Sequence, residues 1–345
     1  MIESKPSGFR DVGDHARGTW DTPGKVVGMR MSHWGRFIGG GVRAVAAGAL
    51  LVGAVSVVAP QTASAAPVCP GAGQAPVLVG RVPGAALEGV AVDGGGRLYT
   101  TDLLSGRVFR LDAPGAPAVP VATVPDGGAG ALAWASDGSL LVGYGADARV
   151  FLGDILRPGA IAKLNTATNV LTPFVSGLSA ANGLDVAADG TAYATNDFGT
   201  QIGRVFPDGR VEPHWATLPS ANGAVLGADD RYLYVSRTFV NPGVSRIPLS
   251  NPGAPESILD LSGLDTFAAP DGLTLDSRGR PVVPANVRGE IWRLDSPGRY
   301  CVLASGLPTS SMVVYGQGSG GFSAGRLFRI GFDGAIYEIP GGFDG

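Results

Sequence analysis

The sequence has few charged residues and very little histidine or cysteine. Charged side chains make up 16% of its 345 residues, and 26 Lys and Arg against 29 Asp and Glu give a net charge of −3. A chain with this balance has neither a basic surface for nucleic acid nor a polybasic segment for anionic lipid. After residue 65 the chain has one histidine and two cysteines, too few for a zinc site built from these ligands.

The chain also lacks an uncharged apolar run of the roughly 20 residues that a membrane-spanning helix needs. A shorter apolar run, residues 44–59, follows two arginines and precedes the small residues Ala63-Ser64-Ala65. A basic start, an apolar centre and an A-x-A exit are the three parts of a secretory signal. We therefore predict a signal peptide over residues 31–65 and a secreted protein with no membrane span after cleavage. Residues 1–30 are interpreted as a non-native or disordered upstream extension.

Glycine and proline, in contrast, are abundant. The 55 glycines and 26 prolines are spread evenly, which indicates many turns and few long helices. Hydrophobic residues make up 45% of the chain, enough to build a core. These features favour an all-β protein.

Two cysteines, Cys69 and Cys301, follow the expected cleavage site. In an exported protein such a pair is expected to form a disulfide, which here would tie the tail of residues 66–75 to a late strand. Two unlinked thiols are the alternative, because the spacing alone does not decide between them.

A short pattern recurs six times after residue 76: a small pair of residues, an alternating apolar strand, a Gly/Asp turn, and two further strands. The copies begin at positions 88, 130, 182, 222, 271 and, more loosely, 310. Four-stranded propeller blades repeat at roughly this interval of 40–50 residues. We predict a single all-β domain over residues 76–345, a six-bladed β-propeller with four-stranded antiparallel blades. Strand Val77–Val82 would complete the last blade.

Two motifs match catalytic or cofactor-binding signatures without the structure that those signatures need. Gly321-x-Ser323-x-Gly325 matches a nucleophile elbow, but no histidine follows it and the next segment is typical of a strand. The overlapping glycines of residues 316–321 match a dinucleotide-binding pattern, again with no helix after them. His214 lies beside Trp215, and we predict a packing role for it.

The first position of the repeat carries an oxygen-bearing side chain in four copies, Glu88, Asn182, Asn222 and Asp271. The first strand of each propeller blade lines the central channel, so these side chains are expected to converge near the axis. Two carboxylates and two amides suit a hard divalent cation, above all Ca²⁺. The alternative is that the Asn-Gly and Asp-Gly pairs only make turns.

On these residues the chain resembles the SMP-30/gluconolactonase/luciferin-regenerating-enzyme family of six-bladed propellers. The similarity extends over residues 76–340 and is carried by Glu88-Gly89, Asn222-Gly223 and Pro270-Asp271-Gly272. The resemblance implies that Glu88, Asn222 and Asp271 hold a divalent cation, often calcium. It further implies that Asn182 contacts substrate or a metal-bound water, and that Asp271 is the candidate base.

The predicted function is that of a secreted, metal-dependent hydrolase of a small-molecule lactone or related ester. The cation in the channel would polarise the carbonyl, Asp271 would accept a proton from water, and Asn182 would orient the substrate. The sequence offers five secondary candidates on the second strands, each with a structural role as its alternative: Asp102, Asn196, Asp197, Arg237 and Asn286.

Two other hypotheses compete with this function. One is a secreted binding propeller whose ion is only structural, since a fold does not confer a function. Departures from the family pattern favour it: Val90-Ala91-Val92 follow the first Glu-Gly, and Ser179-Ala180-Ala181 precede Asn182. The other is chemistry like that of strictosidine synthase or of NHL propellers, which share the fold and its degenerate repeats.

Overall fold

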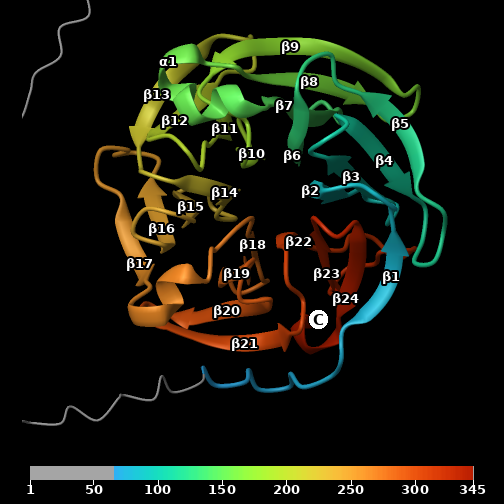
Figure 1. The fold of residues 1–345 in the computed structure, drawn as a ribbon. Helices are drawn as coiled ribbons and strands as arrows, with labels where there is room; N and C mark the ends of the chain where they lie inside the picture. The colour runs from blue at the N-terminus through green and yellow to red at the C-terminus, as the bar shows by residue number, and fades with distance from the viewer. Residues whose placement is uncertain (1–65, 345) are drawn as a thin grey trace, which may run out of the picture. The chain divides into compact units, whose positions relative to one another are not determined.

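A computed structural model describes residues 66–344, and these residues form six four-stranded antiparallel sheets. Figure 1 shows the sheets set around a common centre, with the strand that opens each repeat innermost. The predicted all-β, six-bladed propeller is therefore confirmed. The predicted upstream extension (1–30) and signal peptide (31–65) lie outside the described residues.

Each blade consists of four strands that are neighbours in space, numbered I to VI in chain order. Blades I and II contain β2 (Leu87–Val92), β3 (Leu98–Asp102), β4 (Arg107–Leu111), β5 (Val119–Thr123), β6 (Gly128–Trp134), β7 (Leu140–Ala146), β8 (Gly159–Asn165) and β9 (Val170–Leu178). Blades III and IV contain β10 (Leu184–Val186), β11 (Ala192–Ala194), β12 (Gln201–Val205), β13 (Val211–Thr217), β14 (Ala221–Leu226), β15 (Tyr232–Arg237), β16 (Gly243–Pro248) and β17 (Glu256–Asp260). Blades V and VI contain β18 (Thr274–Leu275), β19 (Pro281–Ala285), β20 (Glu290–Ser296), β21 (Arg299–Ser305), β22 (Ser310–Tyr315), β23 (Leu327–Gly331), β24 (Ala335–Ile339) and β1 (Val77–Arg81).

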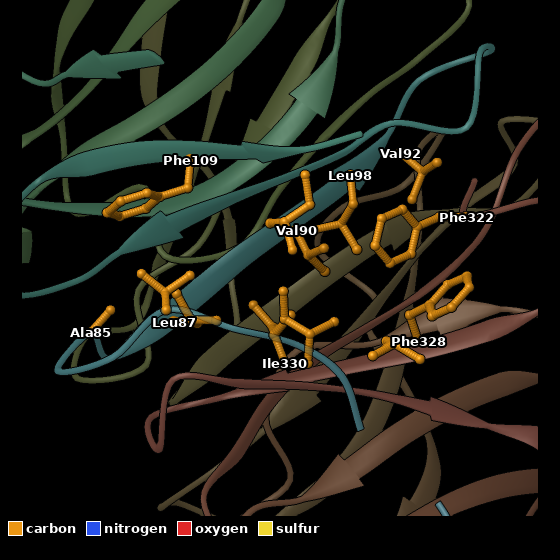
Figure 2. Close-up of a cluster of buried hydrophobic side chains, with 13 residues drawn as sticks. Ala85, Leu87, Val90, Val92, Leu98, Phe109, Phe322, Phe328 and Ile330 are labelled. Atoms are coloured by element: carbon orange, nitrogen blue, oxygen red, sulfur yellow. The ribbon is translucent and has the colours of Figure 1, made fainter. Parts of the chain in front are cut away.

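The N-terminal strand closes the ring. Strand β1 pairs antiparallel with β24 and becomes the outermost strand of blade VI, as predicted. Apolar side chains of blades I and VI then pack face to face, with Val90 and Leu98 beside Phe328 and Ile330 (Figure 2). Because the two blades come from opposite ends of the domain, this buried cluster ties the ends together.

The segment before β1 is attached to blade V. Cys69 and Cys301 form a disulfide, so the prediction of a bridged pair is confirmed. The backbone N–H of Cys69 also donates to the carbonyl oxygen of Val302 (2.9 Å), which places this segment against the outer strand β21.

The short connections follow the turn chemistry of the sequence. Gly138, Gly190 and Gly209 have φ of +81°, +84° and +86°, which a hairpin turn requires and which glycine adopts without strain. The glycine-rich residues 316–325 form the loop between β22 and β23 with no helix in it. Both cofactor and nucleophile interpretations of that loop are therefore excluded.

Helical segments lengthen two of the repeats, one within blade II and one between blades IV and V. The 3₁₀-helix η1 (Ala148–Leu152) and helix α1 (Gly153–Leu156) lie between β7 and β8, and η2 (Gly263–Phe267) lies between β17 and β18. These insertions explain why the repeats that begin at positions 130 and 222 are the longest. A further 3₁₀ turn, η3 (Pro340–Gly342), follows β24. Throughout the described part of the chain, every helix is too short or too polar to cross a membrane.

His214 is the one residue whose predicted role was wrong in this region. It lies on β13 with an exposed side chain, and its Nε2 atom is 2.7 Å from the hydroxyl of Thr217. Trp215 instead faces the core, because consecutive strand residues point to opposite sides of the sheet.

Candidate functional site

A cavity of about 460 Å³ lies where the starts of the first strands meet the ends of the second strands. All four predicted site residues line it. Glu88, Asn222 and Asp271 are buried, and Asn182 is partly exposed. The structure therefore brings together residues that lie up to 183 positions apart in the sequence.

The glycine that follows each of these residues allows the close approach. A Cβ atom added to Gly89, Gly183 or Gly223 would lie 2.2 to 2.5 Å from backbone atoms of the neighbouring first strand. At Gly272 the nearest atom would be the Met312 sulfur, at 2.1 Å. All four glycines lie outside the positive-φ region. The interpretation of these pairs as simple turns is therefore wrong: glycine is needed because the strands crowd together around the axis.

Hydrogen bonds hold the polar side chains of the cavity in pairs. The Asn182 amide donates to Glu88 Oε1 (3.3 Å), and the Asn286 amide donates to Asp271 Oδ2 (2.8 Å). The Asn222 amide donates to the Thr238 hydroxyl (2.9 Å), which in turn donates to the carbonyl oxygen of Pro270 (2.7 Å). We call seven of the eight polar residues that line the cavity, all except Asp147, the polar floor: Glu88, Asn182, Asp197, Asn222, Thr238, Asp271 and Asn286.

The carboxyl groups of the polar floor resist ionisation. Burial, and then the charges of Asp271 and Asp197, raise the pKa of Glu88 well above its ordinary value. Burial raises the pKa of Asp271 to about 7, with the Asp197 charge adding to the effect and the Asn286 hydrogen bond opposing it. Burial also raises the pKa of Asp197 to about 7. Three acidic groups thus share a buried site without a basic partner among the residues that line it.

The second strands contribute to this cavity in a regular way. Of the secondary candidates, Asp197 and Asn286 belong to the polar floor. Asp102, Asn196 and Arg237 lie one position earlier in their blades and have structural partners instead. Asp102 accepts from the backbone N–H of Ala86, Asn196 donates to the Val150 carbonyl, and Arg237 pairs with Asp260.

Sequence reasoning missed Thr238, which directly follows Arg237 and faces the cavity. Because adjacent strand residues point to opposite faces, an error of one position in register exchanges a cavity residue for a structural one. Asp197 and Asn286 both lie 15 positions after the start of their repeats, a position that Arg237 holds in blade IV. Thr238 takes the place in the cavity because the hairpin between β14 and β15 is one residue longer than that between β10 and β11.

The donor set of the polar floor fits a hard divalent cation. Glu88 Oε2 is buried and has no hydrogen-bond partner, which is costly unless a positive group satisfies it. Within residues 66–344, no three His, Cys, Asp or Glu side chains come together as a metal-binding group. A cation site here therefore needs the amide oxygens of Asn182 and Asn222 beside the carboxylates of Glu88 and Asp271, an oxygen set of the kind that Ca²⁺ prefers.

Comparison with known proteins matches residues 86–318 to the SMP-30/gluconolactonase/LRE-like region. The chain belongs to this family. The match spans the starts of blades I, III, IV and V, so it includes every residue of the polar floor. A search of curated protein sequences gave no significant match.

Solved structures show how widely the fold is shared. A gluconolactonase from Xanthomonas campestris has a TM-score of 0.62 and 18% identity, over 80% of this chain and 96% of that one. Regucalcin from Agrobacterium tumefaciens, a calcium-binding protein, has a TM-score of 0.58 and 19% identity, over 77% and 93%. Virginiamycin B lyase from Staphylococcus aureus has a TM-score of 0.51 and 17% identity, over 74% and 84%. At these identities the likeness supports the fold alone.

Proposed function

We propose that this protein is a hydrolase that opens a lactone or a related ester with the aid of a divalent cation, Ca²⁺ above others, at the polar floor. Membership of the family supports the lactonase class. The observation that carries the cation is Glu88 Oε2, a buried acidic oxygen without a partner beside two further carboxyl groups of raised pKa. Glu88, Asn182, Asn222 and Asp271 would hold the ion.

A bound divalent cation would supply Lewis-acid polarisation of the substrate carbonyl. The chain's own residues supply the proton transfer and the orientation. Asp271 is fixed by the Asn286 amide at Oδ2 and by the Gly272 backbone N–H at Oδ1 (3.0 Å). Burial raises its pKa to about 7 in the metal-free site, and a bound cation would lower it, so that the carboxylate is ionised and can take a proton from water near neutral pH. Asn182 is the most exposed of the four ligands, which suits a residue that orients the substrate.

The test combines metal analysis with turnover. The purified protein is assayed for bound metal by mass spectrometry and then against a panel of lactones and esters, with and without chelator. We expect hydrolysis that chelator abolishes and that Ca²⁺ restores better than Mg²⁺ or Zn²⁺. Turnover that survives complete metal removal would contradict the cation's role. Stoichiometric metal with no turnover across the panel would support a binding propeller instead.

We also propose that the protein is exported. The disulfide between Cys69 and Cys301 supports this, because such bonds persist in oxidising compartments. Sequencing the N-terminus of protein recovered from the culture medium of its host should give a start at Ala66. Recovery of the uncleaved chain from the cell interior alone would contradict export.

A further inference from the structure

The cavity above the polar floor has apolar walls. Six apolar residues reach it from all six blades, and we call them the apolar rim: Leu104, Phe151, Phe198, Phe239, Val287 and Phe332. Each of them keeps at least 37% of its surface exposed, although exposed large apolar side chains are usually scattered singly. A cluster of them around one polar cavity is typical of a ligand site.

Leu104, Phe198 and Phe239 of the rim arise from one repeated register. In blades I to IV, β-pairing places Thr100, Val142, Ala194 and Val235 opposite the residue two positions after the start of the repeat. Four residues further on, each of these blades contributes Leu104, Ala146, Phe198 or Phe239 to the cavity wall. The residue before them faces the polar floor in blades III and IV. In blades III and IV the end of the second strand thus contributes one residue to the polar floor and the next residue to the apolar rim.

Three phenylalanines form a continuous aromatic surface on one side of the rim. The rings of Phe198 and Phe239 stack with their centroids 5.1 Å apart and their planes 22° apart, and Phe151 packs on Phe198 at 4.3 Å. Phe151, Phe198 and Phe239 are 60%, 41% and 56% exposed, and all three lie outside the hydrophobic core clusters of the described residues. Their packing therefore contributes little to folding, and a bound apolar group would cover them.

The backbone around these rings is held in place. The backbone N–H of Phe239 donates to the Ser220 hydroxyl (2.7 Å), and that of Phe198 donates to Asn196 Oδ1 (3.0 Å). Because both positions are fixed before a ligand arrives, binding need not order these segments.

The insertion that carries Phe151 is anchored to blade III. Asp154 of helix α1 accepts from the Ser179 hydroxyl (2.7 Å) and from the backbone N–H of Thr200 (2.8 Å). A Cβ atom on Gly153 would lie 2.3 Å from the Ser179 carbonyl oxygen, so only glycine allows this contact. Figure 1 shows α1 beside the strands of blade III.

The charges and hydrogen-bonding groups of the cavity restrict the ligand further. Among the described residues that line it are the acidic Glu88, Asp147, Asp197 and Asp271, but no lysine, arginine or histidine. No side chain there offers an anionic substrate a counter-charge, and the charge of the cation proposed at the floor would be offset by the carboxylates that hold it. The amides and the hydroxyl are confined to the floor and are already paired, so a polyhydroxylated ligand would leave hydroxyl groups unpaired against the rim.

We infer that the cavity takes a neutral lactone or ester with an apolar substituent, whose carbonyl faces the polar floor and whose substituent packs on Phe151, Phe198 and Phe239. The lactone or ester part of this inference rests on the proposed function. The apolar part rests on the rim alone. It implies discrimination against sugar-like and carboxylate-bearing lactones.

The experiment uses lactams, which share the shape and carbonyl of a lactone and resist hydrolysis. Affinities of the calcium-loaded protein are measured by calorimetry for γ-lactams with methyl to octyl substituents and for gluconolactam as the polyhydroxylated probe. We expect affinity to rise about two- to fourfold per methylene, since each buried methylene favours binding. Phe198→Ala and Phe239→Ala should each weaken octyl-lactam binding about tenfold. The matched control is Phe343→Ala, an exposed ring outside the cavity, which should change nothing.

Hydrolysis of the corresponding lactones is measured in parallel, so that the two proposals fail separately. Lactam affinity that rises with chain length, without turnover of any lactone, would support the apolar ligand and contradict the hydrolase. Lactam affinity that is flat with chain length, or gluconolactam binding as tightly as octyl-lactam, would overturn the inference even if lactones were hydrolysed. Since the chain-length series is measured on the unmodified protein, the test does not depend on the folding of any variant.

Discussion

In blades III, IV and V a residue of the polar floor is followed directly by a residue of the apolar rim, yet the two sets depart from the ordinary pattern of burial in opposite ways. The floor buries Glu88 and Asp271, whose pKa values are raised because charge is costly there. The rim exposes phenylalanines that elsewhere in this chain would lie between the sheets, as Phe322 and Phe328 do. Neither arrangement stabilises the fold by itself. Each becomes favourable when a ligand arrives: a cation for the floor, an apolar group for the rim.

The comparison therefore separates residues that serve the fold from residues that serve binding. The blades are held by the clusters between sheets, such as the one that joins blades I and VI (Figure 2). Substitutions at the floor or rim should alter binding with little loss of stability. Substitutions at the structural contacts should lower stability with little effect on binding.

The largest effect is expected from Asp271→Asn at the floor. Turnover should fall about 10²- to 10⁴-fold because the base is lost. The metal-free protein should at the same time become more stable, by about 1–3 kcal/mol, because a buried carboxylate of raised pKa is removed. Steady-state kinetics and urea denaturation measure the two effects. Asp208→Asn, at an exposed carboxylate paired with Arg210, is the matched control and should change neither. Turnover within tenfold of the parent would contradict a catalytic role for Asp271.

The next effect concerns a contact outside both regions. Replacing Cys69 and Cys301 with serine opens a loop that spans 232 positions, and the free energy of unfolding should fall by about 2–5 kcal/mol. Ca²⁺ affinity and preference for long alkyl-lactams should stay unchanged, because the disulfide lies at the outer strand of blade V. A loss of that preference in the folded variant would show that floor and rim are not independent of the periphery.

The metal-free protein should become less stable as the pH rises from 5 to 8. The pKa values of Asp271 and Asp197 are raised to about 7, so the folded state binds more protons than the unfolded state between about pH 4 and pH 7. The stabilisation is complete below the unfolded pKa near 4 and is lost as pH rises through 7, by on the order of 2–4 kcal/mol. Urea denaturation in chelator at pH 5 to 8 measures this loss. Excess Ca²⁺ should reverse the trend; an unchanged slope would count against an ion at the floor.

The smallest effect is expected from Thr238→Val. Valine keeps the shape of threonine but leaves the buried Asn222 amide without its acceptor, so Ca²⁺ affinity should fall about tenfold. Calorimetry with Ca²⁺ measures this, with Thr172→Val on the exposed outer strand of blade II as control. Octyl-lactam binding to the calcium-saturated variant should remain close to that of the parent. Equal loss of calcium and lactam affinity would mean that binding at the polar floor and binding at the apolar rim are coupled.

Much of the fold followed from local chemistry. The Asp-Gly turns, the alternating strands and the first strand that closes blade VI were all predicted. Hairpin turns and the alternation of apolar and polar residues in a strand depend on residues that are neighbours in the sequence. The convergence of Glu88, Asn182, Asn222 and Asp271 on one cavity followed from the repeat, since equivalent positions in a propeller meet at the axis.

The rest could not be predicted in the same way. Asp102, Asn196 and Arg237 were candidates one position away from the residues that face the cavity, because a strand's facing side depends on bulges that the sequence does not reveal. The aromatic surface was missed because Phe151 comes from an insertion, while Phe198 and Phe239 come from two other blades. The unusual length of the repeat that begins at position 130 was the available signal for that insertion.

The sequence by itself determined the number of blades and the polar residue that opens four of them, because both depend on patterns within a few residues of the chain. Only the tertiary structure decided which side chains share a wall of the cavity, since that depends on how far each blade rotates about the axis and where each loop returns. The need for glycine at positions 89, 183, 223 and 272 belongs to the second group: it comes from the crowding of strands that are neighbours only after folding.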